Sequence, residues 1–126
     1  MEVNMLETPN VQRNEPPTLK VKLNQLLSCL EVFRQVDQEM PSQRIVLFLL
    51  VASRPGMRMS DVAKKLGLSS SAVSRNLSEL SKWGIGINKP GVDLLYAEEN
   101  PQDRREKMIY LTPKGERLVE TLNKLS

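Results

Sequence analysis

Hydrophobic residues recur at helical spacing from Thr18 onward, whereas residues 1–17 are polar, proline-bearing and aperiodic. A first stripe follows the spacing i, i+4, i+7, i+11 and i+14, which places its members along one side of a helix for about five turns. Its members are Leu19, Leu23, Leu26, Leu30 and Phe33. Leu27 and Val32 widen this stripe, and two interpretations remain open. The helix meets a second subunit, or both residues cover the domain's own core.

A second helix is predicted over residues 42–52, directly after Pro41, because this stretch is almost entirely apolar. It is too short to cross a membrane, so the pattern indicates a central buried helix. The segment Arg54-Pro55-Gly56 is expected to end it, since proline disfavours helical geometry at the residue before it and glycine permits the turn. Met57-Arg58-Met59 is predicted to form a short strand.

The stretch from residue 59 to residue 83 is predicted to form two short helices joined by a tight turn, the first over residues 61–66. A serine before a helix accepts an orphan backbone N–H, and a glycine after a helix supplies left-handed backbone. These rules predict Ser60 as the first cap, Gly67 as the stop, and Ser69 or Ser70 as the cap of the second helix.

The second of these helices has an apolar side and a polar side. Val73, Leu77 and Leu80 recur at i, i+4 and i+7 and are expected to be buried. The opposite side carries small hydroxyls and cations, namely Ser71, Ser74, Arg75, Ser78 and Lys82. Such a face suits the DNA major groove, where arginine can bind guanine through two hydrogen bonds. It equally suits an ordinary helical hairpin with a solvated outer face, and the downstream sequence decides between the two.

Two strand-like segments follow, residues 92–98 and 107–111, which are rich in aliphatic and aromatic side chains. The polar stretch 99–106 between them is predicted to be the tip of a hairpin. Residues 84–91 are predicted to form a loop whose two isoleucines, Ile85 and Ile87, turn inward. A two-stranded hairpin after a helix-turn-helix indicates a wing, which favours the DNA-binding interpretation.

Thr112 and Pro113 are expected to begin a last helix, as a cap followed by proline at the first helical position. This helix is predicted to reach about residue 125. Its apolar residues are expected to leave an exposed excess that joins the first helix in an interface between two copies of the chain. They are Leu118, Val119, Leu122 and Leu125.

Composition narrows the classes of function. The 126 residues are 40% hydrophobic and 26% charged, which fits one globular domain at 18–126 preceded by a flexible arm at 1–17. The net charge of +3 is unevenly spread, because the arm holds three glutamates and one arginine and the remainder carries +5. A basic folded part favours an anionic partner, with nucleic acid ahead of a membrane, whereas the acidic arm is a poor grip for DNA.

Cysteine and histidine usage argues against an enzyme. The chain has one cysteine, Cys29, and no histidine, so an internal disulfide, a zinc site and the usual nucleophile–base pairs lack the residues they need. We therefore expect no catalytic residues, no cofactor and no metal. Cys29 lies among apolar positions and is predicted to be a buried small hydrophobe. No apolar stretch approaches 18 residues, which predicts a cytoplasmic, nucleoid-associated protein with no membrane partner.

The hairpin tip Asp103-Arg104-Arg105, followed by Ile109-Tyr110-Leu111-Thr112-Pro113-Lys114-Gly115, resembles the MarR (multiple antibiotic resistance regulator) family of winged-helix regulators. In that family the wing and next helix commonly read Asp-Arg-Arg, a short strand, then Leu-Thr-x-x-Gly. Two arginines on a narrow hairpin can enter the minor groove, where the negative potential is deepest. The adjacent aspartate can hold one guanidinium by a charge-assisted hydrogen bond. The resemblance implies that Arg105 is inserted and that Arg104 contacts the backbone.

The resemblance covers about residues 19–125 and has two departures. Residues 86–92 look like an insertion before the wing, an extended form similar to regulators of bacterial viruses. The chain also ends after one helix where typical members have two that interlock with the partner subunit, so dimerisation would rest on the first and last helices.

The sequence thus predicts a mainly α (α+β) fold, a winged helix-turn-helix with a two- or three-stranded wing and flanking dimerisation helices. The predicted function is that of a homodimeric, sequence-specific regulator of transcription that binds double-stranded DNA. Ser70, Ser71, Ser74 and Arg75 would read the major groove with Ser78 beside them, Arg104 and Arg105 would enter the minor groove with Asp103 orienting them, and Lys82 and Lys107 would contact phosphates. The alternative is a winged-helix module that binds a polymerase or a replication protein, which the short dimer region, the insertion and the acidic arm favour.

Overall fold

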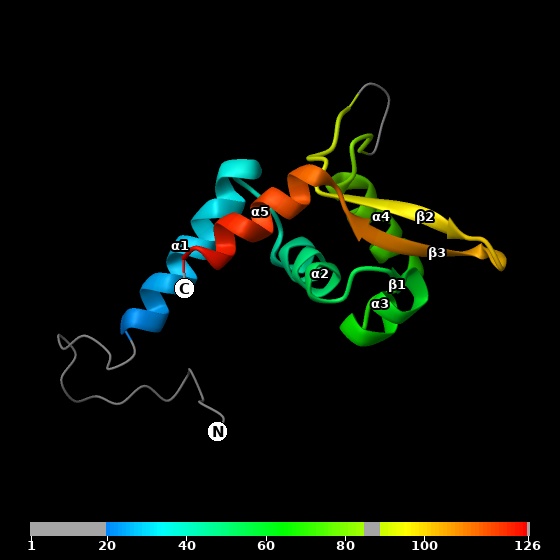
Figure 1. Ribbon diagram of the computed structural model, residues 1–126, viewed down its shortest axis with the longest axis horizontal. Coiled ribbons are helices and arrows are strands. Elements are labelled where there is room, and N and C mark those ends of the chain that lie inside the picture. Colours follow the sequence, from blue (N-terminus) through cyan, green and yellow to red (C-terminus); the bar gives the residue numbers. More distant parts are fainter. Residues whose placement is uncertain (1–19, 85–88, 126) are drawn as a thin grey trace.

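The computed structural model describes residues 20–84 and 89–125, which form helices around a small antiparallel sheet (Figure 1). In chain order the elements are α1 (Lys20–Val36), α2 (Ser42–Ser53), β1 (Met57–Arg58), α3 (Met59–Leu66), α4 (Ser70–Leu80), β2 (Leu95–Asn100), β3 (Asp103–Leu111) and α5 (Pro113–Asn123). The predicted winged helix-turn-helix is confirmed, with α3 and α4 as the helical pair. The predicted arm, Leu19, Ile85 and Ile87 lie outside the described residues. Within the described ranges, no helix has the length and apolar character needed to cross a membrane.

β3 is the central strand of a three-stranded sheet with the order β1-β3-β2, and both pairings are antiparallel. Met57 of β1 and Ala97 of β2 face Ile109 from its two sides. β1 is only two residues long, so the outer half of β3 pairs with β2 alone. Residues 98–107 therefore form a two-stranded hairpin that projects away from the helices (Figure 1), and we call this hairpin the wing.

The hydrophobic core lies where the helices meet the inner end of the sheet. Phe33 of α1 and Phe48 of α2 pack edge to face, with ring centroids 5.7 Å apart. Aliphatic side chains supply the rest of the core, as the low aromatic content requires. They are Leu47, Val51, Val62, Val73, Leu77, Leu80, Leu94, Leu95, Ile109 and Leu118. The predicted burial of Val73, Leu77 and Leu80 on one side of α4 is therefore confirmed.

The helix-turn-helix follows most of the local rules that the sequence suggested. Gly67 has φ 66°, the left-handed conformation expected after α3, and Ser69 Oγ accepts a backbone N–H from the first turn of α4. The cap predicted at Ser60 is wrong, because β1 leads directly into α3 and the helix already begins at Met59. The hydroxyl of Ser60 instead donates to Glu106 Oε1 on β3 at 2.7 Å.

Both wing strands reach further into the polar tip than predicted. β2 occupies residues 95–100, not 92–98, and β3 begins at Asp103, so only Pro101 and Gln102 remain between the strands. Both faces of this hairpin are largely exposed, so hydrogen bonds between the two backbones hold it together without buried apolar side chains. The pattern of hydrophobic residues therefore could not predict where the two strands end.

The segment that leads into β2 is joined to the end of α4 by backbone hydrogen bonds. The N–H groups of Gly91, Val92 and Leu94 donate to carbonyls within residues 79–82 at 3.0, 3.1 and 2.7 Å. They satisfy carbonyls that the end of a helix leaves unpaired. A Cβ at Gly91 would lie 1.9 Å from the carbonyl oxygen of Ser81, so only glycine fits there. The base of the predicted insertion is thus fixed to the end of α4.

α1 leaves its leucine stripe uncovered. Phe33 at the end of the stripe is buried, but Leu26 and Leu27 are 57% and 59% exposed, and Leu23 and Leu30 are exposed as well. The four leucines therefore do not belong to the domain's own core, although Phe33 does. Of the two residues that widen the stripe, Val32 packs on the core, as one interpretation expected, whereas the exposed Leu27 favours an interface with another chain.

The other apolar helix faces are used differently from expectation. The exposed excess predicted for the last helix is wrong, because α5 lies against α1 (Figure 1), Leu118 is buried, and Val119 and Leu122 pack on the core. The predicted burial of α2 is wrong in part, since Val46 and Leu49 on its outer side are exposed. Cys29, expected to be buried, is only half-buried.

Candidate nucleic-acid interface

The outer side of α4 presents four hydroxyls and one cation. Ser70, Ser71 and Ser74 are exposed, Ser78 is half-buried, and Arg75 is exposed with no interaction to another described residue. These side chains stand opposite the buried Val73, Leu77 and Leu80, so the core contacts fix which side of α4 faces outward. This side matches the predicted reading face except at its end.

Lys82 does not belong to the helical face on which it was predicted. α4 ends at Leu80, and Lys82 lies in the bend that follows, with Nζ 5.4 Å from the ring centroid of Trp83. Trp83 itself is 77% exposed. The pair combines a cation with a flat apolar surface at the end of α4.

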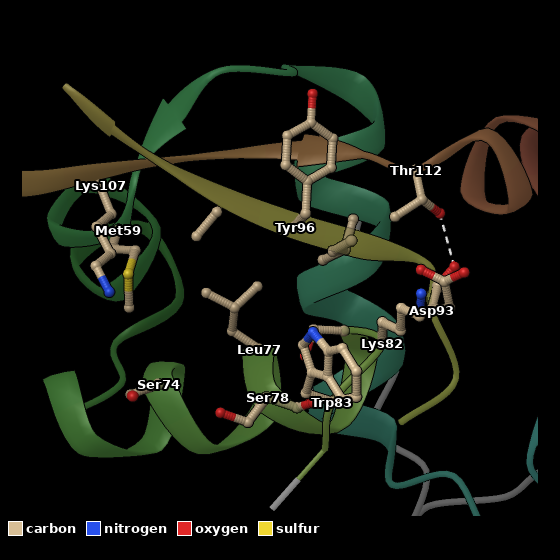
Figure 2. Close-up of a pocket in the computed structure, with 13 residues that line it drawn as sticks. Met59, Ser74, Leu77, Ser78, Lys82, Trp83, Asp93, Tyr96, Lys107 and Thr112 are labelled. Carbon is tan, nitrogen blue, oxygen red and sulfur yellow. Dashed lines mark hydrogen bonds between the residues drawn. The ribbon is translucent and has the colours of Figure 1, made fainter. Parts of the chain in front are cut away.

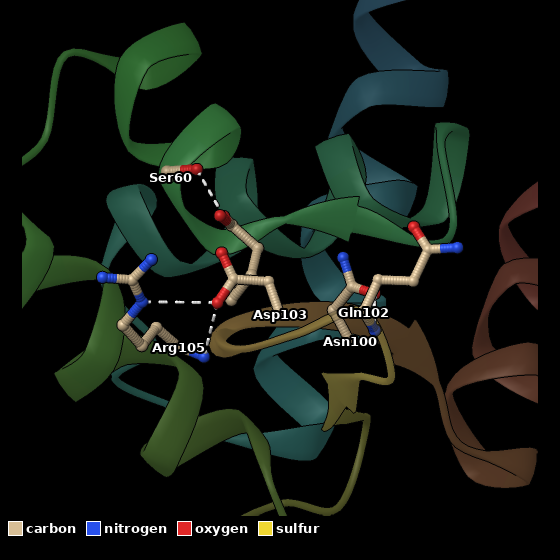
Figure 3. A network of polar contacts seen from close by, with 6 residues as sticks. Ser60, Asn100, Gln102, Asp103 and Arg105 are labelled. Atoms are coloured by element: carbon tan, nitrogen blue, oxygen red, sulfur yellow. Dashed lines mark hydrogen bonds and ion pairs between the residues drawn. The ribbon is translucent and has the colours of Figure 1, made fainter.

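The tip of the wing is held by short-range hydrogen bonds (Figure 3). Asp103 Oδ1 accepts the backbone N–H of Arg105 at 3.1 Å and pairs with its Nε at 3.4 Å. Asn100 Oδ1 accepts the backbone N–H of Gln102 at 3.0 Å. The Arg105 side chain is nevertheless 93% exposed. Because neighbouring residues of a strand point to opposite faces, Arg104 and Arg105 cannot both turn toward α4.

Two grooves separate α4 from the wing, with volumes of about 490 and 400 Å³. Met59 and Lys107 line both grooves, and Figure 2 shows the first of them. The first groove has the following polar and aromatic lining: Ser74, Ser78, Ser81, Lys82, Trp83, Asp93, Tyr96, Lys107 and Thr112. The second groove lies toward the wing tip, with Ser60, Ser70, Arg105, Glu106 and Lys107 along it. In both grooves hydroxyls of α4 face a cation of the wing, and we call the two neighbouring grooves together the channel.

The structure brings six of the predicted residues together in these grooves: Ser70, Ser74, Ser78, Lys82, Arg105 and Lys107. Ser71, Arg75 and Arg104 are exposed outside the grooves, and Asp103 contacts Arg105. The arrangement suits an elongated anion that passes between α4 and the wing. Residues of α4 and of the wing outside the grooves can contact the parts of the ligand on either side.

The wing carries charged side chains of both signs. β2 and β3 carry four acidic side chains (Glu98, Glu99, Asp103 and Glu106) and three basic ones (Arg104, Arg105 and Lys107). Asp103 pairs with Arg105, and Glu106 accepts the hydroxyl hydrogen of Ser60. The wing therefore offers a few placed cations and no uniformly basic patch.

Sequence reasoning missed three features of this region. The sequence analysis assigned no role to Trp83, although a large aromatic side chain beside a lysine is a usable signal. The Ser60–Glu106 hydrogen bond joins residues 46 positions apart and has no local signature. Asn76 interrupts the apolar side of α4 and is buried, which the helical spacing alone could have flagged.

Comparisons with known proteins agree with this geometry. The family profile of the IclR helix-turn-helix domain matches residues 25–85, from within α1 to just beyond α4. No curated protein matches the sequence. Among solved structures, MepR of S. aureus in a complex with DNA aligns with 85% of this chain and 80% of its own, at 22% identity and a TM-score of 0.65. MarR aligns with 86% of this chain and 75% of its own, at 18% identity and a TM-score of 0.58.

The chain has the MarR-type winged-helix fold. The resemblance drawn from the Asp103-Arg104-Arg105 motif is thus confirmed at the level of fold. The PcaV transcriptional regulator of Streptomyces coelicolor shares the fold, with a TM-score of 0.56 and 21% identity over 86% of this chain and 74% of its own. The transcriptional repressor CouR, bound to a 23-mer DNA duplex, gives a TM-score of 0.57 and 24% identity over 85% of this chain and 68% of its own. Within the MarR-type fold, the insertion predicted at 86–92 stays a prediction.

Proposed function

We propose that this protein is a sequence-specific transcriptional regulator that binds double-stranded DNA with α4 in the major groove and the wing in the adjacent minor groove. The observation that carries the proposal is the channel between α4 and the wing, with hydroxyls on one side and cations on the other. On duplex DNA the two grooves are separated by one sugar-phosphate strand. That strand would occupy the channel, where Ser74, Ser78, Lys82 and Lys107 can donate to its phosphates.

Base readout would come from the side chains outside the channel. Arg75 is exposed on α4 and has no partner among the described residues, so its guanidinium is free to bind a guanine edge. Ser70 and Ser71 lie at the amino-terminal end of the same helix, the end that enters the major groove in helix-turn-helix complexes. MepR and CouR, which share the fold, are each described in complex with DNA.

We further propose that the working form is a homodimer joined through the leucine stripe of α1. An exposed apolar surface of this kind usually marks an interface, and a two-fold contact between identical chains is the commonest form. A two-fold axis would place the two α4 helices on half-sites about 34–36 Å apart, one turn of DNA. A protein with this role would work in the cytoplasm, at the nucleoid.

Arg105→Ala is expected to weaken specific binding by about 1–3 kcal/mol, because the largely exposed guanidinium would lose its contact with the minor groove. The dependence of log K on log salt should become shallower by about one unit, since one phosphate-neutralising cation is removed. Fluorescence anisotropy on a labelled duplex across a salt series measures both quantities. The matched control is Arg117→Ala, an exposed arginine on α5 away from the wing, which should change neither. Native affinity and salt dependence for Arg105→Ala would remove the wing from the interface.

A winged-helix module that binds a polymerase or replication protein is the second candidate. The observation that favours it is Trp83, because a largely exposed tryptophan is typical of the centre of protein interfaces. The two candidate functions predict different results when the protein is mixed with a pool of DNA duplexes. The regulator recovers a defined site from a mixture of duplexes, and the interaction module recovers none.

A further inference from the structure

The buried side of α4 contains one polar side chain. Asn76 is 6% exposed and lies between Val73 and Leu80 on the helix side that packs on α2 and the sheet. A helix that needed only burial would carry an aliphatic residue there, since taking an amide out of water costs free energy unless every hydrogen bond is replaced. The hydrogen bonds of Asn76 therefore show what the residue does.

The amide of Asn76 is bonded on both of its ends. Its Nδ2 donates to Gln43 Oε1 at 2.9 Å and to the carbonyl oxygen of Ala72 at 3.0 Å. Its Oδ1 accepts from Arg44 Nε at 3.2 Å. Both long-range partners belong to α2, so two directional bonds join the middle of α4 to the first turn of α2.

The network continues from α2 toward α1. The Arg44 side chain is 15% exposed, and its guanidinium lies 3.9 Å from Asp37 Oδ2 in the segment between α1 and α2. Among the described residues, no buried side-chain polar atom is left without a hydrogen bond. A fully satisfied network of this kind favours one arrangement of the elements that it joins.

Apolar contacts alone would define the rotation of α4 about its own axis less sharply. Burial of leucine and valine is non-directional, so a helix can rotate or slide over such a surface at low cost. A rotation of about 20° displaces a side-chain tip at a radius of about 6 Å by roughly 2 Å. That displacement is enough to break a hydrogen bond to a base edge, which tolerates only a few tenths of an ångström.

We propose that Asn76, held by Gln43 and Arg44, is a positioning residue that fixes the rotation of α4 on α2 and thereby sets the DNA sequence specificity of the protein. Asn76 itself points away from the reading face and makes no contact with DNA. The inference rests on the proposed DNA-binding function, and it concerns specificity apart from stability. When Asn76 is replaced, Gln43 is exposed and Arg44 is only partly buried, so the groups that lose their partner can bond water. We therefore expect the change in specificity to exceed the change in stability.

The test compares Asn76→Leu and Arg44→Lys with the unsubstituted chain. Arg44→Lys keeps the positive charge near Asp37 but lacks the Nε donor, and Arg54→Lys, at an exposed arginine just after α2, is its matched control. Each protein is titrated against the duplex that the unsubstituted chain selects and against a scrambled duplex of equal length, at the same salt concentration. We expect Asn76→Leu and Arg44→Lys to lower the ratio of the two affinities about tenfold or more. The affinity for the scrambled duplex and its salt dependence should stay native. The unfolding temperature should fall only slightly, because the groups left unpaired can reach water.

A second measurement needs no DNA. Residual dipolar couplings of backbone amides report the direction of each N–H bond, so they detect a rotation of α4 about its own axis relative to α2. The couplings of α4 should change in both variants, while those within each helix still fit one regular helix. Native specificity ratios together with native couplings would overturn the proposal, and if Asn76→Leu does not fold, Arg44→Lys decides. If the unsubstituted chain selects no duplex, the proposed function fails and the couplings alone judge the positioning role.

Discussion

Replacing Leu26 and Leu27 with glutamate is expected to turn a dimer into a monomer. Both side chains are more than half exposed, they sit on the same side of α1 as Leu23 and Leu30, and no described residue of the same chain covers them. Two carboxylates per chain at the proposed two-fold contact would repel their copies and lose solvation, so the dimer would not form. Analytical ultracentrifugation at tens of micromolar measures the change.

DNA binding should fall with the loss of the dimer. A monomer contacts one half-site at a time, and the second contact no longer benefits from the first, so affinity for a two-half-site duplex should drop by about 10²- to 10⁴-fold. The control adds the same two charges on the polar side of α1, as Ser28→Glu with Gln35→Glu, and should stay dimeric. A monomeric unsubstituted chain, or a dimer that survives the leucine substitutions, would contradict the role given to α1.

Substitutions on the buried and exposed sides of α4 are expected to differ strongly in their effect on stability. Leu77→Ala is expected to lower the free energy of unfolding by about 2–5 kcal/mol, because it removes a buried side chain from the core and leaves a cavity. Arg75→Ala, two positions away on the exposed side, should change stability by less than about 0.5 kcal/mol. Urea titration followed by circular dichroism measures both values.

The same pair of substitutions should rank in the opposite order as defects of binding. Arg75→Ala is expected to cost about 1–3 kcal/mol in affinity for the selected duplex and to relax the preference at one base pair. Leu77→Ala, measured where it is still folded, should retain that preference. Equal destabilisation by both substitutions would mean that the sides of α4 are wrongly assigned.

Local sequence rules predicted the helical part of this molecule well. Gly67 and Ser69 fix the turn before α4, and Thr112 caps α5, because each acts within a few residues of its own position. The apolar spacing of Val73, Leu77 and Leu80 sufficed to identify the buried side of α4. Together with the strand-like segments after α4, these features sufficed to predict the winged helix-turn-helix from the sequence.

Features that depend on contacts between residues far apart in the chain could not be predicted from the sequence. The hydroxyl of Ser60 looked like a helix cap, yet it bonds Glu106 on β3, and only the assembled sheet brings the two together. Leu118 looked like part of an outer surface, but α5 turns back along α1 and buries it. The polar wing strands carry no hydrophobic alternation, since no core lies beneath them, and their ends could not be predicted from pattern.

The candidate site also combines features that the sequence predicts with features that it does not. The residues of the reading side follow from helical spacing, and Arg105 follows from a motif, so both were predictable. The channel between α4 and the wing was not, because it depends on the angle between two elements and on Met59 and Lys107, which line it from different parts of the chain. Lys82 was assigned to the right surface but to a helix that ends before it.

Selection of bound fragments from random and genomic duplexes, with the full chain at near-physiological salt, asks directly whether this protein recognises a DNA sequence. We expect enrichment of one inverted-repeat sequence whose half-sites are centred about 10 base pairs apart, with Arg75→Ala shifting the preference inside each half-site. Arg105→Ala should recover the same sequence at lower yield. Recovery of no enriched sequence from either pool would contradict the assignment of this protein as a DNA-binding regulator and would make the protein-binding module the better account.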